Sequence, residues 1–504
     1  MSRLEIKRYK WDQINWRKLK RSVFKLQKRI YQASQKEDFV KVHNLQKLLI
    51  KSRSAKLLAI KKVSQENEGK KTAGVDGIKS LNNRQRLEMV RKLKLGSKSK
   101  PVRRIWIPKP GKPEKRPLGI PTMEDRAKQA LAKMALEPQW EARFEPNSYG
   151  FRPGRSCQDA VQAIFLSIYK SNQYVLDADI KGCFDNINHQ ALLNKLETFP
   201  KIRQAIKGWL KAGIMDEEVY FKTKAGTPQG GVISPLLANI ALHGIEEDTK
   251  NALSEELHQH LKIFHKRSDR KRALTMLRII RYADDFLVLH ESEEIVKKAK
   301  TFIKLWLKKM GLNLNAVKTK IVHTLKTYEG NKPGFEFLGF NVRQFLVKNK
   351  KRGFKTIIKP SSEGQKRHRS CIRKYVKKLT SATQRQVIKT LNPIIRGWTN
   401  YYKAFVARKA FESADHYMFT CLWKWARWRH HNKGLRWIKH KYFRRYRNNN
   451  WRFMTTTNEM LLLHSDIHIK RHIKVKENRS PYDGDVKYWN RNMSTKEKVI
   501  WRYA

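Results

Sequence analysis

The stretch RYADDFLVLH, residues 281–290, sets two adjacent carboxylates, Asp284 and Asp285, inside an apolar run. The residues on both sides, 274–280 and 286–289, are rich in branched and aromatic side chains that favour β-strands. We therefore predict a β-hairpin with the two carboxylates at its tip. Because aspartate is also a common turn residue, this segment alone fits a plain surface hairpin equally well.

The composition of the 504-residue chain indicates a polyanionic partner. Lysine and arginine number 110 against 44 acidic residues, which gives a net charge of +66. Such an excess is typical of proteins that bind nucleic acid. A membrane is the other common polyanion, but no apolar run reaches the length of a spanning helix, and we expect no secretory signal at the N-terminus. The hydrophobic content of 40% is enough for a folded core.

The four cysteines are Cys157, Cys183, Cys371 and Cys421, and no two are close in sequence. This spacing argues against a zinc knuckle and against a disulfide framework. We expect buried thiols in a reducing compartment, either a bacterial cytoplasm or the interior of a plastid or mitochondrion.

The periodicity of the chain predicts a mixture of helices and strands. Strands are expected at 174–180 and in a Pro/Gly-punctuated hairpin at 101–121. Residues after 445 show little periodicity. Helices are expected in segments 1–68, 80–97, 124–142, 189–213, 235–242, 247–272 and 365–445.

The strand at 174–180 carries Asp177 and Asp179 on one face, because side chains alternate along a strand. If this strand lies beside the hairpin, its carboxylates converge with Asp284 and Asp285. Clustered carboxylates repel one another unless cations hold them, and hard oxygen ligands beside phosphates suit Mg²⁺. Two such ions can drive an in-line phosphoryl displacement. The pattern predicts a site for two Mg²⁺ ions that faces a polyanion.

Two motifs here resemble those of reverse transcriptases. YADD (282–285) is similar to the YxDD box of that family, and DIKGCFD (179–185) resembles its first palm motif. The resemblance implies a polymerase that copies RNA into DNA with two Mg²⁺ ions. By this resemblance the catalytic residues are Asp179, Asp284 and Asp285, and the metal ligands are Asp179, Ile180 and Asp284.

Phe184, five positions after Asp179, matches the family's bulky residue that excludes a ribose 2′-hydroxyl. An aromatic ring below the sugar clashes with that oxygen, which favours dNTPs. A plain core residue is the alternative. Asp177 and Asp185 stay open between metal ligation and a local salt bridge.

Further motifs follow in the family's order. They are NSYGFRPGRS (147–156), GTPQGGVISP (226–235), GLNLNAVKT (311–319) and FLGF (337–340). A glycine-flanked turn lets the backbone approach a nucleotide, and a glutamine can reach its sugar or base. The resemblance implies nucleotide contacts from Gln229 and Lys318 and nucleic-acid contacts from Arg152 and Arg155.

The hairpin at 101–121 supplies cations. By resemblance, Lys109 and Arg116 hold the nucleotide triphosphate, which an arginine can grip with two hydrogen bonds. They stand seven apart where relatives often show six, so Lys112 or Lys115 can share the role. A solvated basic turn is the alternative.

Finer motifs resemble the group II intron-encoded proteins. KTAGVDG (71–77), RPLGIPT (116–122) and PQGGVISP (228–235) carry this resemblance, and LNPIIRGWTNYY (391–402) resembles the maturase domain. The resemblance extends over about residues 60–480 and is nearest to the chloroplast-like class.

Aromatic and basic residues interleave in and after the maturase-like segment. Rings suit base stacking and cations suit phosphate, as in RNA-binding surfaces. An amphipathic bundle with tryptophan in its core is the alternative, and both hold if different faces serve each purpose. The residues implied as nucleic-acid contacts are Arg396, Trp398, Tyr401, Arg427 and Arg429.

We therefore expect an α+β fold of the right-hand polymerase type. Its parts are a basic helical extension (1–68), fingers and palm (69–345), a helical thumb or maturase domain (346–445) and a basic DNA-binding region (446–504). No cysteine follows Cys421, so the HNH endonuclease of many relatives is expected to be absent. A cationic arm is the favoured interpretation of this last region, and a metal site is the alternative at the regularly spaced His464, His468 and His472.

The function implied is an RNA-directed DNA polymerase and intron maturase. It binds its group II intron RNA, assists splicing and copies the intron into DNA during retrohoming, with target DNA and dNTPs as further partners. A splicing-only maturase, a CRISPR-associated reverse transcriptase and a plain basic nucleic-acid-binding protein are the alternatives. The sequence indicates no oligomeric state.

Overall fold

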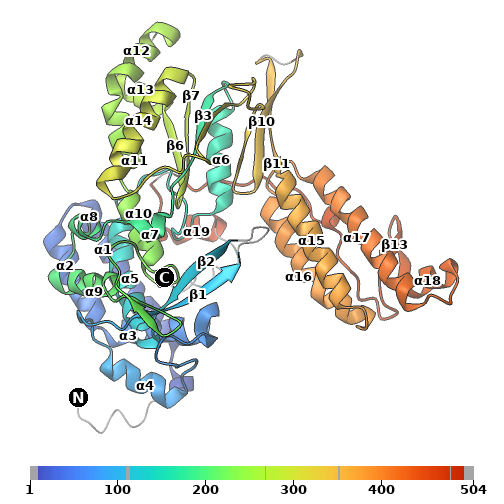
Figure 1. Cartoon of the computed structure of the whole chain (residues 1–504), viewed down its shortest axis with the longest axis horizontal. Helices are drawn as coiled ribbons and strands as arrows, with labels where there is room; N and C mark the ends of the chain where they lie inside the picture. Colours follow the sequence, from blue (N-terminus) through green and yellow to red (C-terminus); the bar gives the residue numbers. More distant parts are fainter. Residues whose placement is uncertain (1–9, 109–113, 267, 350–351, 477, 493–504) are drawn as a thin grey trace. The chain divides into compact units, whose positions relative to one another are not determined.

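The computed structural model describes residues 10–108, 114–266, 268–349, 352–476 and 478–492 (Figure 1). These residues divide into two compact units. Unit 1 comprises the described residues within 1–156, 176–320 and 475–504, and unit 2 comprises those within 157–175 and 321–474. The units interleave along the sequence, and one border falls inside strand β3 (Tyr174–Asp179). Among the described residues, no helix is both long and apolar enough to span a membrane.

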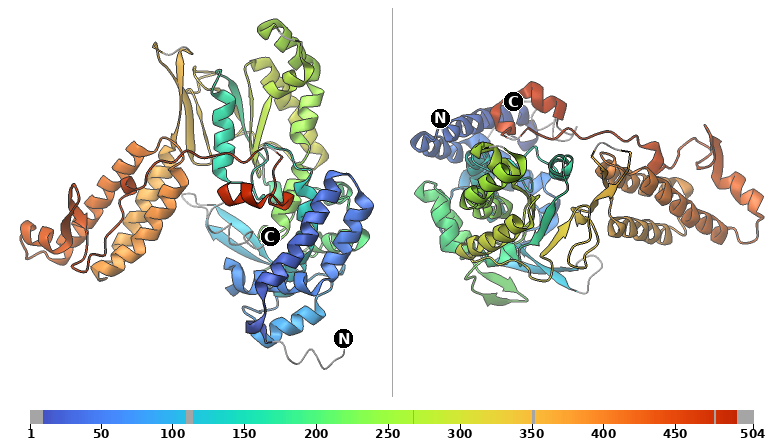
Figure 2. Two further views of the ribbon diagram at one scale, coloured as in Figure 1. Left: turned by 180° about the vertical axis from the view of Figure 1, so that it is seen from behind. Right: turned by 90° about the horizontal axis from the view of Figure 1, so that it is seen from above.

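The N-terminal part of unit 1 is helical. Helix α1 (Trp16–Gln35) buries one stripe of side chains, which includes Val23, Ile30 and Tyr31 at helical spacing. It lies beside α2, as Figure 2 shows, and also packs on α3 and α5. The bounds of these helices are α2 (Phe39–Lys51), α3 (Arg53–Lys61), α4 (Asn83–Lys92) and α5 (Met123–Glu141). Short turns of helix, η2 (Trp11–Gln13), η3 (Lys62–Glu66) and η4 (Glu68–Lys71), flank them.

A four-stranded sheet in unit 1 has the order β2-β1-β4-β5. The predicted hairpin at 101–121 is confirmed, because β1 (Val102–Pro108) pairs antiparallel with β2 (Lys115–Ile120). On its other edge β1 runs parallel to β4 (Ile214–Asp216), and β5 (Val219–Phe221) closes the sheet.

A second sheet carries the opening motif. Strands β6 (Arg278–Tyr282) and β7 (Asp285–His290) form the predicted antiparallel hairpin, and β3 follows β7 in the sheet. The expectation that the first strand begins at 274 is wrong, because α13 (Arg270–Met276) occupies those residues. Asp269 caps that helix by accepting a hydrogen bond from the Arg272 backbone N–H, so the helix forms before the strand can start.

Helices cover the sheet and connect its strands. The helical segment expected at 189–213 is divided at Pro200, because the residue before a proline is pushed into an extended conformation. The helices of this region are α7 (Cys183–Asn186), α8 (His189–Lys195), α9 (Pro200–Leu210), α10 (Ser234–Leu242), α11 (Ile245–Ala252), α12 (Ser254–His265), α14 (Glu293–Lys309) and α19 (Val486–Asn492), with the short turn η6 (Pro481–Asp483) before the last.

Unit 2 combines a small sheet with a helical bundle. The sheet is antiparallel in the order β11-β10-β9, and the bundle core includes Ile372, Leu391, Leu422 and Trp425. Its elements are α6 (Cys157–Ile168), β9 (Phe335–Phe337), β10 (Phe340–Leu346), β11 (Phe354–Pro360), α15 (Ser362–Lys378), α16 (Gln384–Tyr402), α17 (Arg408–Arg429), α18 (Leu435–Tyr442), β12 (Phe443–Tyr446), β13 (Asn449–Phe453) and η5 (His464–Asp466). Strand β8 (Lys320–His323) begins at the border between the units.

Candidate active site

The hairpin between β6 and β7 turns tightly at Ala283 and Asp284. Tyr282 pairs with Asp285 across the turn, and Ala283 takes a left-handed conformation with φ +60°. The turn rests on the backbone of Gly150, where an added Cβ atom would lie 2.3 Å from the Ala283 nitrogen. Glycine is therefore required at 150 for this turn to take its position.

Three predicted carboxylates converge at this turn. Asp179 ends strand β3 next to β7, and its carboxylate accepts a hydrogen bond from the Asp285 carboxyl when the latter is protonated. Although Asp285 is exposed as a whole residue, the protein around its carboxyl raises its pKa to about 7, and the charges of Asp284 and Asp179 add to this. Burial also raises the pKa of Asp284, with Asp179 contributing. The pKa values rise mainly because burial removes water from the carboxylates, and the like charges of their neighbours add to the shift.

One side of Asp179 is held by the segment after α14. The Lys318 Nζ atom lies 2.7 Å from Asp179 Oδ2, and Asn315 Nδ2 donates to the same oxygen at 3.1 Å. The Asn315 backbone N–H also donates to the Asp179 carbonyl at 2.8 Å. Ile180 is buried beside Leu314 through a β-bridge. The sequence analysis did not predict that the Asn315 amide contacts Asp179, although Asn315 lies inside the quoted GLNLN motif.

The donor set of this site fits Mg²⁺. Carboxylate oxygens are hard ligands, and Asp179 and Asp284 bring them together at one turn. Within the part of the chain that the structure describes, no group of three His, Cys, Asp or Glu side chains is arranged to hold a metal by itself. Mg²⁺ commonly takes only one or two protein carboxylates and completes its shell with water and substrate phosphates, so two or three oxygens here suffice.

Phe184 and Gln229 line a cavity of about 340 Å³ at the sheet β2-β1-β4-β5. The Gly119 backbone N–H donates to the Gln229 carbonyl at 2.6 Å, which fixes the loop after Gly226 against β2. Gln229 Nε2 lies 3.2 Å from Asp185 Oδ2. The Asp185 carboxylate therefore accepts a hydrogen bond from an amide, and burial raises its pKa.

Of the basic residues predicted to bind the nucleotide triphosphate, only some lie within the described residues. Arg116 is exposed on β2, and its charge acts on both Asp284 and Asp185. Lys109 and the alternative Lys112 lie outside the described residues. Asp177 shares a strand face with Asp179, and burial raises its pKa to about 6 while Lys320 opposes that shift.

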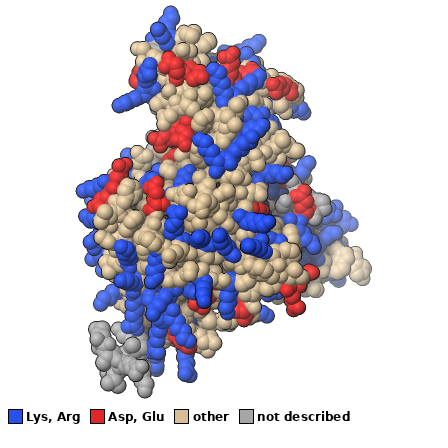
Figure 3. All heavy atoms as spheres, turned by 60° about the vertical axis from the view of Figure 1, so that its left-hand side comes forward, with Lys and Arg blue, Asp and Glu red and all other residues tan. Residues whose placement is uncertain are grey.

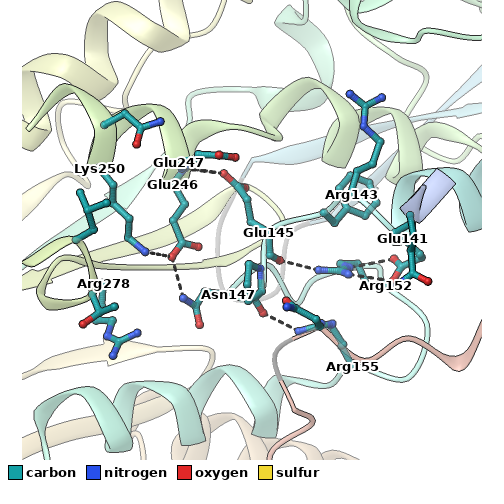
Figure 4. A pocket seen from close by; sticks show the side chains of 18 of the residues that line it. Glu141, Arg143, Glu145, Asn147, Arg152, Arg155, Glu246, Glu247, Lys250 and Arg278 are labelled. Atoms are coloured by element: carbon teal, nitrogen blue, oxygen red, sulfur yellow. Dashed lines mark hydrogen bonds and ion pairs between the residues drawn. The ribbon is translucent and has the colours of Figure 1, made fainter. Parts of the chain in front are cut away.

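Arg152 and Arg155 are buried, which is at odds with their predicted contact to nucleic acid. Arg152 makes two hydrogen bonds of 3.0 Å to the Glu141 carboxylate, and both side chains are 1% exposed (Figure 4). Its remaining nitrogen donates to the carbonyls of Glu145 and Ser148. Arg155 donates to the Pro146 carbonyl at 2.7 Å. Both guanidinium groups therefore hold the loop 145–156, beside a polar cavity of about 620 Å³.

Replacing Arg152 with alanine is expected to destabilise unit 1 by roughly 3–5 kcal/mol, because the Glu141 carboxylate is left buried without its partner. Hydrogen–deuterium exchange across α5 and the loop 145–156 measures the loss as faster exchange. The double variant Arg152→Met, Glu141→Leu is the control, and it should recover much of the protection because no unpaired charge remains. Equal loss in both variants would mean that the ion pair is not what fixes this loop.

The predicted RNA contacts in unit 2 divide into two groups. Arg396 and Arg427 are exposed. Trp398 stacks on His368 with ring centroids 4.3 Å apart. Tyr401 stacks on Phe340. Both rings pack inside unit 2, Trp398 against helix α15 and Tyr401 against strand β10. Arg429 does the same, because it donates to the carbonyls of Thr380 and Ala382.

The three regularly spaced histidines do not gather into one site. His464 is buried and bonds Asp415 at 2.7 Å and His368 at 2.7 Å, whereas His472 pairs with Asp159 at 2.9 Å. The two therefore lie in different side-chain clusters, and this argues against a shared metal. No sequence signal could have paired His464 with His368, because the two residues are far apart along the chain.

The positive charge is displayed on the surface. Figure 3 shows one face of the molecule, where lysine and arginine side chains outnumber acidic ones and crowd the lower part of the view. An exposed excess of this kind binds a polyanion in a salt-dependent manner.

Three family models match the chain. The model described as "Reverse transcriptase (RNA-dependent DNA polymerase)" matches residues 107–342. The model for the N-terminal domain of reverse transcriptase matches residues 11–93. The model for the group II intron, maturase-specific domain matches residues 365–443. The order of the three agrees with the order of motifs found in the sequence.

Curated relatives agree with these models. The group II intron-encoded protein LtrA of Lactococcus lactis subsp. cremoris is 32% identical over 407 residues, which is 67% of this chain and 66% of that protein. Protein YkfC of Escherichia coli (strain K12) is 30% identical over 55% of this chain and 77% of its own length. Maturase-like protein 1 of Euglena gracilis is 28% identical over 77% and 76%.

A solved telomerase structure from Candida albicans gives a TM-score of 0.36 at 13% identity, with 68% and 65% of the two chains covered, which is below the level that assigns a fold. The three family models and the relatives at 30% identity or more carry the assignment. The chain therefore belongs to the family of group II intron-encoded reverse transcriptases and maturases.

Proposed function

We propose that this chain is an RNA-directed DNA polymerase that also acts as a maturase for a group II intron. The observation that carries the polymerase is the convergence of Asp179, Asp284 and Asp285 at one turn. Phe184 and Gln229 line a cavity in the same unit, within the residues matched by the reverse transcriptase model. The maturase-specific match at 365–443 supports the second role.

Reverse transcriptases use divalent metal ions, and Asp179, Ile180 through its carbonyl and Asp284 would hold them here. Two bound Mg²⁺ ions supply activation of the primer hydroxyl and stabilisation of the leaving oxygen. Asp285 lies against Asp179 and supports its position. Lys318, which pairs with Asp179, is the cation on this side of the site that would contact the nucleotide triphosphate.

The remaining residues of the site select and hold the nucleotide. Arg116 and Lys109 would bind the triphosphate, since an arginine pairs with phosphate through two hydrogen bonds. The Phe184 ring would exclude the 2′-hydroxyl of a ribonucleotide, and Gln229 would contact the sugar or base. The proposed substrates are therefore dNTPs, with an RNA strand as template.

The maturase role rests on RNA binding. A net charge of +66 and the match to the maturase-specific domain support group II intron RNA as the partner. Exposed Arg396 and Arg427 are the candidates for phosphate contact in unit 2. Target DNA is the further partner that copying the intron into a new site requires.

Two assays on the wild-type protein test the proposal. Primer extension on an RNA template with dNTPs and Mg²⁺ should give full-length DNA, and the protein should accelerate splicing of a group II intron at near-physiological salt. Splicing without extension would favour a maturase that no longer polymerises. If the protein extends the primer but does not accelerate splicing of the intron that encodes it, a different class of reverse transcriptase, such as a CRISPR-associated one, would be favoured.

A further inference from the structure

Phe151 has a backbone conformation that an aromatic residue rarely adopts. Its φ angle is +59°, and among the described residues it is the one aromatic side chain in the left-handed region. Strain of this kind persists only where the surroundings fix the residue. Its neighbours Gly150 and Gly154 would both meet close atoms if they carried a Cβ. A glycine at 151 would remove the strain, so the ring itself is the feature to be explained.

The backbone on both sides of Phe151 is fixed by buried contacts. The Gly150 carbonyl accepts a hydrogen bond of 2.8 Å from buried Asn239, and its Cα lies against the catalytic turn. Arg152, on the other side, is locked into its buried pair with Glu141. The direction of the Phe151 side chain is therefore set by the same backbone that supports Ala283.

The ring of Phe151 meets the ring of Phe184. Their centroids are 6.2 Å apart with an interplanar angle of 76°, which is an edge-to-face contact. Phe184 itself is half-buried, and its backbone is fixed by a hydrogen bond from the Thr227 N–H to its carbonyl at 2.5 Å. That bond fixes the backbone and not the side chain, whose ring makes its edge-to-face contact with Phe151.

We propose that Phe151 is a positioning residue that holds the Phe184 ring in place and thereby sets how strictly the site rejects ribonucleotides. The inference rests on the proposed polymerase function. Phe151, which lies in the loop 145–156, would act on the sugar of the nucleotide only through the Phe184 ring. A ring that is free to rotate leaves space for a 2′-hydroxyl, whereas a ring held at its edge does not.

The test compares incorporation of dCTP and CTP opposite guanosine in an RNA template. The quantity measured is the ratio of kcat/KM for the two nucleotides. Phe151→Ala and Phe151→Gly should each lower this ratio about three- to tenfold, the effect of one lost edge-to-face contact. Phe151→Tyr keeps a ring and should retain the wild-type ratio. The glycine variant also removes the strain, so agreement between the two ring-less variants assigns the effect to the ring.

A double-variant cycle tests whether Phe151 acts through Phe184. Phe184→Val should lose discrimination by itself, and adding Phe151→Gly should change the ratio no further. An unchanged ratio in the single Phe151 variants would overturn the inference, as would additive effects in the double variant or an equal fall in kcat/KM for both nucleotides. A wild-type protein that extends no primer would instead contradict the proposed function, so the two failures are distinguishable.

Discussion

Replacing Asp284 with asparagine is expected to slow RNA-templated extension of a DNA primer by about a thousandfold or more. The substitution keeps the size of the side chain but removes a charged oxygen ligand from the cluster that Asp284 shares with Asp179. RNA binding should persist, because one carboxylate changes little in a chain with a net charge of +66. Single-turnover extension rates and RNA dissociation constants measure the two properties separately.

Asp177→Asn is the matched control for this variant. Its carboxylate shares a strand face with Asp179, but its nearest compensating charge is Lys320. We expect it to keep most of the extension rate. Extension by Asp284→Asn at the wild-type rate would mean that the metal site lies elsewhere, and intron splicing by the same variant should continue in either case.

Replacing Gly150 with alanine is also expected to slow primer extension strongly, although position 150 contributes no side chain to the site. The new Cβ would lie 2.3 Å from the Ala283 nitrogen and 2.9 Å from the Tyr282 carbonyl carbon, so the turn that carries Asp284 must move. A displacement of about 1 Å at a catalytic group can cost on the order of a hundredfold in rate. Primer extension of the purified variant measures this loss.

Gly96→Ala is the control for the glycine variant, because its added Cβ meets nothing within 4 Å. It should extend primers at the wild-type rate. Faster hydrogen–deuterium exchange confined to 147–150 and 281–285 in Gly150→Ala would locate the disturbance at the turn. A fully active Gly150→Ala protein would contradict the placement of this loop against the hairpin.

The domain borders expected from the sequence remain a prediction. The compact units do not follow a linear division, since residues 157–175 group with 321–474 and the described residues after 475 group with unit 1. Periodicity reports local structure and cannot say which distant segment a helix packs against. Helix α13 is a different case, because its N-cap Asp269 is a local signal that the strand-prone residues after 274 had outweighed.

The sequence by itself determined the hairpin that carries Asp284 and Asp285, the strand that carries Asp179 and the family, because alternation, turn residues and short motifs are local properties. Only the tertiary structure decided which charged residues are buried. The motif around Arg152 predicted a contact with nucleic acid, and only the structure shows that its side chain is buried against Glu141. The contact of Phe151 with Phe184 is likewise invisible in the sequence, because the distance between two side chains from separate segments is set by the packing of the whole unit.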